Sequence, residues 1–412
     1  MPETTTDFCV IGGGPAGMTL ALLLLRSGCR VTVVERSRSL AREYRGEILQ
    51  PGGLAVLDAL GVLAPARERG GYELARFRLS EGSRTLIDID YRRLGPPYDY
   101  LLSVPQAHLL QALLDACRAY ESFHYLPGEK ISELILEKRV VRGVVTSGRR
   151  TIGAHCVVGA DGRYSKTRKL AGLDYRRSED FDFDVLWFRL PAAAPAPVAH
   201  IFRAEGTPML AYPSYPGSVQ LGMTLRHKGY ADLSRHGLGH VKQRLRWAAP
   251  PYAELIDEHI TSMRDFSLLD VFAGDTRPWV RAGLALIGDA AHTHSPLGAQ
   301  GINLAVQDAA VIHPILLETL RSGAASTELL AEFEANRRPA IDRLFRIQRL
   351  QGKAMLSRSR LAGFLRPKAA ALVGRGPIAA KITEQIAYGR ERIRITETRI
   401  EEDEPQQDSR IG

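Results

Sequence analysis

The sequence of 412 residues predicts an α/β fold in which a dinucleotide-binding domain with a mostly parallel sheet is interrupted by a domain built on an antiparallel sheet. Material typical of a parallel sheet occurs three times, at the N-terminus, near residue 157 and near residue 286. Segments with the composition of antiparallel strands lie between the last two. A discontinuous first domain with a second domain inserted into it accounts for this order.

The N-terminal segment has the pattern of a βαβ unit. Residues 7–11 form a short apolar strand, residues 15–27 an apolar helix that ends at Gly28, and residues 30–34 a second strand. Residues 8–25 carry no charge, but the run of glycines and Pro15 interrupts any continuous helix there. We therefore expect a soluble cytoplasmic protein rather than a membrane span.

The later elements predict where the two domains begin and end. Helices are expected over 51–60, 106–120 and 302–321, and strands over 183–190, 198–202, 209–212 and 219–225. The dinucleotide-binding domain is predicted over 1–75, 101–173 and 271–345, and the β-rich domain over 76–100 and 174–270. A C-terminal helical segment over 346–400 and a flexible tail over 401–412 complete the chain.

The net charge of +9 favours basic solvated faces over nucleic-acid binding, because no basic run is interleaved with aromatic residues. Residues 361–386 alternate apolar residues with Arg366, Lys368, Arg375 and Lys381, which would suit contact with an anionic membrane. A helix packed on the first domain with its basic face in water is the favoured alternative.

The four cysteines form no metal-binding or disulfide pattern. Cys9, Cys29, Cys117 and Cys156 each lie in or beside an apolar segment, and none forms a CxxC pair. We expect buried free thiols and no metal site.

A glycine-rich motif follows the first strand and opens the first helix. Gly12 allows the tight turn, Gly14 lets the backbone approach a pyrophosphate, and Gly17 lets the helix pack closely on the strand. Glu35 ends the second strand, where a carboxylate accepts hydrogen bonds from ribose hydroxyls and disfavours a 2′-phosphate. The motif alone leaves FAD and NAD open, and a turn that serves packing only is the alternative. The residues expected to contact the dinucleotide here are Gly12, Gly14, Pro15, Ala16, Gly17, Glu35 and Arg36.

Two later segments resemble fingerprints of flavin monooxygenases. Residues 286–292 (LIGDAAH) and 296–303 (PLGAQGIN) resemble the "GD" fingerprint, whose aspartate, here Asp289 after Gly288, binds the ribityl chain of FAD in that family. The loop with Gly298 and Gly301 opens a helix at Ile302, so backbone N–H groups can face the flavin. A strand ending in a capping aspartate is the alternative for Asp289 alone.

Residues 158–165 (VGADGRYS) are similar to the "DG" fingerprint of the same family. In that family the motif, here Asp161-Gly162, is associated with FAD and with the nicotinamide nucleotide. The alternative is a strand–turn–helix connection in which Asp-Gly makes the turn.

The three ordered fingerprints resemble group A FAD-dependent monooxygenases, the para-hydroxybenzoate hydroxylase family, over about residues 5–345. The resemblance implies FAD as cofactor and NADPH or NADH as a transient co-substrate. It also implies a flavin C4a-hydroperoxide that inserts one atom of O2 into a small aromatic or phenolic molecule, most commonly by hydroxylation. A FAD-dependent reductase or oxidase acting on an isoprenoid or quinone without oxygen insertion is the alternative.

The resemblance also assigns individual residues. Arg45 matches an arginine that contacts FAD near its pyrophosphate, Gln106 a residue near the cofactor, and Asn303 a residue near the pyrimidine side of the flavin. Pro296 matches a loop proline beside the flavin edge where oxygen reacts, so Arg45 and Pro296 are the candidate catalytic residues. For His292 and His294, a packing role is favoured over that of a base. The substrate pocket is expected between the β-rich insert and the flavin domain.

Overall fold

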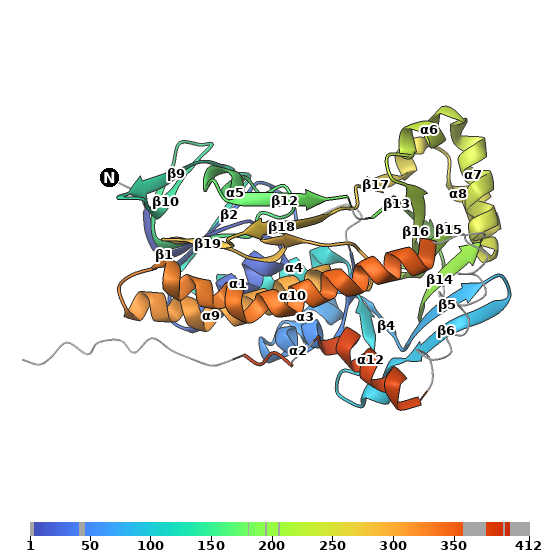
Figure 1. Ribbon diagram of the computed structural model, residues 1–412, viewed down its shortest axis with the longest axis horizontal. Helices are drawn as coiled ribbons and strands as arrows, with labels where there is room; N and C mark the ends of the chain where they lie inside the picture. The colour runs from blue at the N-terminus through green and yellow to red at the C-terminus, as the bar shows by residue number, and fades with distance from the viewer. Residues whose placement is uncertain are drawn as a thin grey trace, which may run out of the picture.

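The computed structural model describes residues 4–40, 46–179, 181–193, 196–204, 207–356, 376–389 and 392–395. It confirms the predicted fold class, a mixed α/β architecture with two large sheets and helices toward the C-terminus (Figure 1). The predicted flexible tail over 401–412 lies outside these residues, as do Arg45, Arg366, Lys368 and Arg375. The exact domain boundaries stay a prediction, and helix α10 (Thr327–Leu356) runs without a break through position 345, where one of them was placed.

In the described part of the chain, eight strands form the sheet that carries the N-terminus. The spatial order is β19-β20-β11-β1-β2-β8, with β10 and β9 extending from β11. Its central strands are parallel, while β9, β10 and β19 pair antiparallel. The strands are β1 (Thr4–Ile11), β2 (Val31–Glu35), β8 (Phe123–Pro127), β9 (Ile131–Glu137), β10 (Val140–Thr146), β11 (Thr151–Gly159), β19 (Val280–Arg281) and β20 (Leu284–Leu286).

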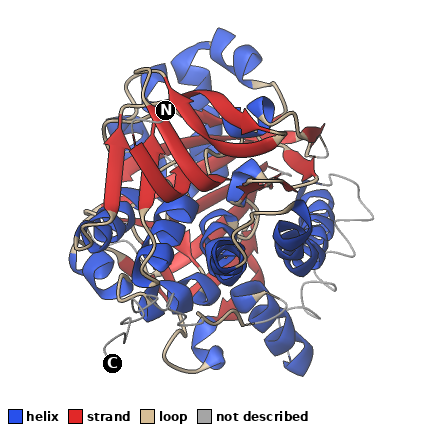
Figure 2. Ribbon diagram, turned by 90° about the vertical axis from the view of Figure 1, so that its left-hand side faces the viewer, coloured by secondary structure: helices blue, strands red, loops and turns tan. Residues whose placement is uncertain are grey.

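The central strands of this sheet contain runs of buried apolar residues, which indicates that both faces are covered there. Phe8, Cys9 and Val10 of β1 are fully buried, as expected for a parallel strand between helices. Helix α1 is buried from Ala16 to Leu25 and packs against α4 and α9. Figure 2 looks at the end of the molecule with β9 and β10, with the helices crowded beside the strands. The helices of this part are α1 (Pro15–Arg26), α2 (Pro51–Ala59), α3 (Leu63–Glu68), α4 (Gln106–Arg118), α5 (Lys166–Leu170) and α9 (Gly301–Arg321).

A second large sheet contains seven of the described strands, in the order β17-β13-β16-β15-β14-β5-β6. Most neighbours are antiparallel, as predicted, but β14 runs parallel to β5, which comes with β6 from a distant part of the chain. The strands are β5 (Arg76–Glu81), β6 (Arg84–Asp90), β13 (Phe183–Pro191), β14 (Val198–Ala204), β15 (Thr207–Ser214), β16 (Ser218–Arg226) and β17 (Ser267–Leu269).

The two faces of this second sheet have different neighbours. Leu186, Phe188 and Leu221 pack in a separate core under helices α6 (Tyr230–Arg235), α7 (Gly237–Ala248) and α8 (Ala253–His259). Trp187 and Tyr212, on the opposite face, belong to the core shared with the eight-stranded sheet. Strand alternation therefore divides the sheet into a helix-covered face and a face toward the rest of the molecule.

Two small sheets connect the large ones. Strand β12 (Asp174–Ser178) leads into the second sheet and β18 (Ala273–Arg277) leads back, and they pair antiparallel, with β21 (His292–Thr293) beside β18. Strands β3 (Ile48–Leu49), β4 (Tyr72–Leu74) and β7 (Leu101–Ser103) form the other small sheet.

The C-terminal part that is described consists of helix α12 (Gly376–Tyr388) and residues 392–395. Ala387 and Tyr388 are buried, and α12 contacts α2. This contact agrees with the favoured alternative of packing on the first domain for this part of the predicted basic segment. Among the described helices, none combines the length and the apolar character that crossing a membrane requires.

Candidate active site

The glycine-rich loop after β1 has no room for side chains at two positions. Gly12 has a φ of +111°, and a Cβ there would lie 2.4 Å from the carbonyl oxygen of Ala160. A Cβ on Gly17 would lie 2.0 Å from the carbonyl oxygen of Gly12. Gly14 caps α1 in an extended conformation, with Pro15 and Ala16 in the first turn. The motif thus allows β1, α1 and the end of β11 to pack closely together. Helix α1 begins directly after this loop.

Glu35 lies beside this loop at the end of β2. Its carboxylate is buried and accepts hydrogen bonds from the backbone N–H of Gly13, at 2.6 Å, and of Ser37, at 2.8 Å. Backbone donors therefore hold the side chain of Glu35, the residue predicted to bind the ribose, beside the glycine-rich loop. Arg36 is exposed, and Arg45 is not among the described residues.

The Asp161-Gly162 segment follows β11 and begins α5. Asp161 accepts hydrogen bonds from the N–H groups of Lys166 and Thr167 and from the Thr167 hydroxyl in the first turn of α5, whose N-cap is Ser165. Gly162 has a φ of +81°. The turn that was the alternative explanation is therefore present, and it is built against Gly12 of the first motif.

Arg168 connects the second motif to the third, and the sequence analysis missed it. Its buried guanidinium donates to the carbonyl oxygens of Ala290, at 2.9 Å, and Arg163, at 3.1 Å. It also stacks on the ring of Tyr175 with 3.7 Å to the centroid. Its position seven residues after Asp161, on the helix that the motif opens, was the signal available in the sequence.

The Gly288-Asp289 turn is held by a buried charge cluster centred on Asp308 of α9. Asp308 is fully buried and accepts hydrogen bonds from the Gly288 N–H at 2.9 Å, His292 Nε2 at 2.8 Å and Arg337 Nε at 2.8 Å. Burial alone would raise the pKa of Asp308, but His292 and Arg337 outweigh it and lower the pKa to about 2. His292 is therefore hydrogen-bonded within this buried cluster, which agrees with the structural role that was favoured over that of a base. Asp289 is half-exposed, with one oxygen 3.7 Å from Arg163 Nε.

The loop before α9 is tied to α2 through Asn303. Asn303 is buried, accepts from the Gln50 N–H at 2.8 Å and donates to the Ala299 carbonyl at 2.7 Å. Gln50, a residue that the sequence analysis missed, donates to the Gly298 carbonyl at 3.0 Å. The loop bends at Gly298 and Ala299, both with positive φ, and leaves Gly298 and Gly301 exposed, Pro296 half-buried and Ile302 buried.

Several buried side-chain atoms near these segments have no hydrogen-bond partner in the described part of the chain. They include Oε1 of Gln106, at the start of α4, Nδ1 of His292, Oε1 of Gln348, and Nε2 of His294, whose pKa burial lowers to about 4. A buried polar atom without a partner is costly, and a ligand commonly supplies the missing hydrogen bond. The sites of Gln106 and His294 thus fit a polar group that is supplied from outside the chain.

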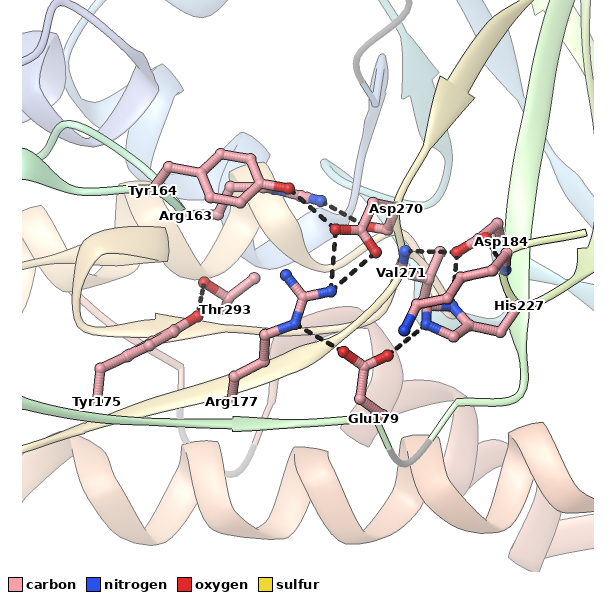
Figure 3. A network of polar contacts seen from close by, with 11 residues as sticks. Arg163, Tyr164, Tyr175, Arg177, Glu179, Asp184, His227, Asp270, Val271 and Thr293 are labelled. Atoms are coloured by element: carbon pink, nitrogen blue, oxygen red, sulfur yellow. Dashed lines mark hydrogen bonds and ion pairs between the residues drawn. The ribbon is translucent and has the colours of Figure 1, made fainter. Parts of the chain in front are cut away.

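A polar network runs from the second and third motifs to β12 and β18, the strands that lead into and back from the second sheet (Figure 3). Arg163 and Tyr164 hydrogen-bond to Asp270, which precedes β18, and Arg177 of β12 donates to both oxygens of Asp270. Beyond Arg177, Glu179 contacts His227, which in turn contacts Asp184 of β13. The network fixes the entry to and exit from the second sheet relative to the motifs.

Asp184, His227 and Asp270 of this network are close enough together to share a metal ion. The Asp184 carboxylate, however, accepts from the N–H groups of Lys228 and Val271, and Asp270 is paired with Arg177. The cluster is explained by these contacts, and we assign no metal to it.

The face of the second sheet toward the motifs carries a polar group next to aromatic residues. Arg189 of β13 donates to Glu47 Oε1 at 2.8 Å, and Ser214 of β15 donates to Glu47 Oε2 at 2.7 Å. Trp187 and Tyr212 pack edge-to-face beside them, with ring centroids 6.4 Å apart. Burial raises the pKa of Glu47 more than Ser214 and Arg189 lower it. Glu47 immediately precedes β3, so the group lies at the junction between the two sheets.

Comparison with known proteins identifies the family to which this chain belongs. A family model described as "FAD binding domain" matches residues 5–348. The chain is 57% identical over 403 residues to 6-methylpretetramide 4-monooxygenase of Streptomyces rimosus, covering 97% of this chain and 96% of the relative. It is 27% identical over 360 residues to kynurenine 3-monooxygenase of Salinispora arenicola, covering 81% and 76% of the two chains.

The structural comparison agrees. PqsL, a probable FAD-dependent monooxygenase from Pseudomonas aeruginosa, matches with a TM-score of 0.76 at 26% identity, covering 87% of this chain and 99% of PqsL. The predicted resemblance is therefore confirmed, and the reductase or oxidase alternative is not favoured. The chain belongs to the FAD binding domain family and is a flavoprotein monooxygenase of the group A type.

Proposed function

We propose that this enzyme hydroxylates 6-methylpretetramide or an aromatic polyketide of the same class, with NADH or NADPH as the reductant. The reaction type is FAD-dependent aromatic hydroxylation. The observation that carries the choice of substrate is the 57% identity with 6-methylpretetramide 4-monooxygenase over almost the full length of both chains.

The described residues fit FAD. The loops at Gly12 and Gly298 lead into α1 and α9. The backbone N–H groups in the first turns of these helices favour a negatively charged ligand. Gln106 and His294 offer buried polar atoms that a ligand would satisfy. The residues that we propose to hold FAD are Gly12, Gly14, Pro15, Ala16, Gly17, Glu35, Arg36, Arg45, Gln106, Asp161, Gly162, Gly288, Asp289, Pro296, Gly298, Gly301, Ile302 and Asn303.

Bound FAD would supply the electron transfer and the activation of oxygen, and the chain would supply position and environment. Asn303 and Gln50 set the conformation of the loop that contains Pro296 and Gly298. The Asp308 cluster keeps the Gly288-Asp289 turn in place without exposing its own charges. The buried, aromatic face of the second sheet would exclude water from the reacting region.

The test is turnover of 6-methylpretetramide by the purified holoenzyme with NADH and, separately, NADPH under isotopically labelled oxygen. We expect one labelled oxygen atom in the product, detected by mass spectrometry, and faster consumption of one nucleotide than of the other. Flavin reduction without incorporated label from this substrate or from related polycyclic phenols would contradict the proposal. An unlabelled product with a reduced double bond would instead support the reductase alternative.

A further inference from the structure

His294 is a buried histidine whose ring is not explained by packing within the described chain. It lies directly after β21, in the loop that leads through Pro296 to α9, and it is only 5% exposed. Its Nε2 is buried without a hydrogen-bond partner among the described residues. Such a nitrogen costs free energy unless a group from outside the chain binds it.

Two neighbouring side chains that also carry a buried atom without a partner are anchored through their other polar atom. His292 Nε2 is hydrogen-bonded to Asp308, and Gln348 Nε2 donates to two carbonyl oxygens of the loop that follows His294. No hydrogen bond to a described residue anchors the His294 ring in this way. The loop is therefore fixed by its neighbours, while Nε2 of His294 is left to bind a ligand.

The edge of the His294 ring faces the N-terminus of α9. Outside the helix backbone and the chain neighbours of Gly301, one described atom would lie within 4 Å of a Cβ added to Gly301, and this atom is His294 Cε1, at 3.8 Å. That distance is an ordinary van der Waals contact, so an atom beside Gly301 can touch the imidazole at the carbon next to Nε2. Gly301 itself is exposed, so a ligand can approach it.

This end of α9 offers hydrogen-bond donors. The helix has 21 residues, and no side chain caps its N-terminus after Gln300. The N–H groups of the first turn and the helix dipole favour an acceptor that carries negative charge. A group that binds here is therefore an acceptor oxygen, and His294 fits it when Nε2 carries the proton and donates.

The groups around His294 leave its ring neutral at neutral pH. Asp289 and Asp308 favour the protonated ring, whereas His292 and Arg163 oppose it, and burial outweighs all of them and lowers the pKa of His294 to about 4. The ring can thus donate a hydrogen bond without bringing a positive charge into the core. Because Asp289 is one of the residues that we propose to hold FAD, its influence on His294 also places the ring beside the proposed cofactor site.

We propose that His294 is a further cofactor-binding residue, which donates a hydrogen bond from Nε2 to an oxygen of FAD at the N-terminus of α9. The inference rests on the proposed function, because Gly301 and Ile302 belong to the residues that we propose to hold FAD. The oxygen is a carbonyl of the flavin ring or belongs to the ribityl or phosphate chain, and the test separates these sources. The sequence favoured a packing role for His294.

The test compares two substitutions of similar size. His294→Met removes the donor, whereas His294→Gln retains an amide N–H close to the position of Nε2. Each holoenzyme would be diluted through a concentration series without substrate or reductant, and the fluorescence of released FAD gives the dissociation constant. We expect this constant to rise about tenfold in His294→Met and to stay within about threefold of the wild type in His294→Gln.

His313→Met is the matched control, since His313 is also a buried histidine whose pKa burial lowers to about 4. His313 lies on α9 itself, but its Nε2 is hydrogen-bonded to Ser27 Oγ at 2.8 Å within the chain. The control should therefore make the holoenzyme easier to unfold in urea and leave the dissociation constant of FAD unchanged.

The visible absorbance of the bound oxidised flavin identifies the oxygen. A band that shifts in His294→Met and returns to the wild-type position in His294→Gln assigns the hydrogen bond to the flavin ring. A raised dissociation constant with an unshifted band assigns it to the ribityl or phosphate chain. Either result supports the inference.

Three outcomes would overturn the inference: an unchanged dissociation constant and an unchanged band in His294→Met, equal weakening in His294→Met and His294→Gln, or equal weakening in His313→Met. If His294→Met does not fold, His294→Asn replaces it, because asparagine is too short to bring its amide to the position of Nε2. It must then bind FAD more weakly than His294→Gln, and equal binding would overturn the inference. Product formation from 6-methylpretetramide tests the proposed function separately, since no substrate enters these titrations.

Discussion

Two buried carboxylates have pKa values that are shifted in opposite directions: Asp308 on the flavin side, and Glu47 at the junction with the second sheet. Asp308 is fully buried and accepts from Gly288, His292 and Arg337, and its pKa is lowered to about 2. Glu47 is nearly as buried and accepts from Arg189 and Ser214, but its pKa is raised. The partners of Asp308 more than compensate its burial, whereas those of Glu47 do not.

The difference separates a charge that stabilises the fold from one that does not. A carboxylate with a lowered pKa stabilises the folded state at neutral pH, and one with a raised pKa is destabilising there. Asp308 therefore accounts for the rigidity of the Gly288-Asp289 turn. For Glu47, the hydrogen bonds from Arg189 and Ser214 do not compensate for burial, so its charge does not stabilise the fold in the same way.

The largest expected effect comes from breaking the Asp308 cluster. Asp308→Asn should lower the free energy of unfolding by about 3 kcal/mol at pH 7, because it leaves Arg337 buried without its ion pair. The folded pKa lies below the unfolded value of about 4, so this stabilisation is present above pH 4 and is lost as the pH falls toward 2. Urea unfolding of both proteins between neutral and acid pH measures it.

The control for Asp308→Asn is Asp115→Asn on α4, which removes an exposed ion pair with Arg69. That change should alter stability by less than about 0.5 kcal/mol. A constant difference between wild type and Asp308→Asn down to acid pH would contradict the proposed charge compensation.

The next effect tests the glycine-rich loop. Gly17→Ala would place a methyl group 2.0 Å from the Gly12 carbonyl oxygen, so α1 must move away from β1, at a cost of about 1–3 kcal/mol. We expect most of the bound FAD to be lost, measured as visible flavin absorbance per protein. Gly239→Ala in α7, where a Cβ meets no atom within 4 Å, should retain full flavin and unchanged or slightly increased stability. Equal flavin content in both variants would remove the loop from the proposed cofactor site.

A smaller effect is expected for Glu47→Gln on stability. Because the pKa of Glu47 is raised, its ionisation penalises folding as the pH rises above the unfolded value, and glutamine relieves this penalty. The variant should remain within about 1 kcal/mol of the wild type at pH 7. A loss as large as that of Asp308→Asn would show that the two carboxylates have the same structural role.

The smallest effect concerns the four cysteines, which are all buried and free. Burial raises the pKa of Cys9 and Cys156 to about 12, so little thiolate is present at neutral pH. A chromogenic thiol reagent should react slowly with the native enzyme and with all four thiols after unfolding. Rapid reaction of one thiol in the native state would mean that part of the flavin-side core opens readily.

The local motifs were predictable because their chemistry is contained in short segments. The turn at Gly12, the strand–turn–helix at Asp161 and the loop at Gly298 each combine a strand end, a glycine and a helix start within a few residues. Even there, the structure adds hydrogen bonds from the first turn of α5 to Asp161, and it adds Arg168, whose partner Ala290 lies far away in the sequence. Asp308 and Arg337 carried no local signal, since an acidic and a basic residue within helices usually indicate solvated faces.

The sequence by itself determined the alternation of buried strands, glycine turns and helices, and with it the fold class and the three motifs, because hydrophobic period and glycine conformation are local properties. Only the tertiary structure decided which distant side chains share a buried space. Glu47 meets Arg189 because β3 and β13 approach at the junction, and β5 joins β14 in parallel from a distant segment. Such pairings depend on long-range packing, which no short stretch of sequence specifies.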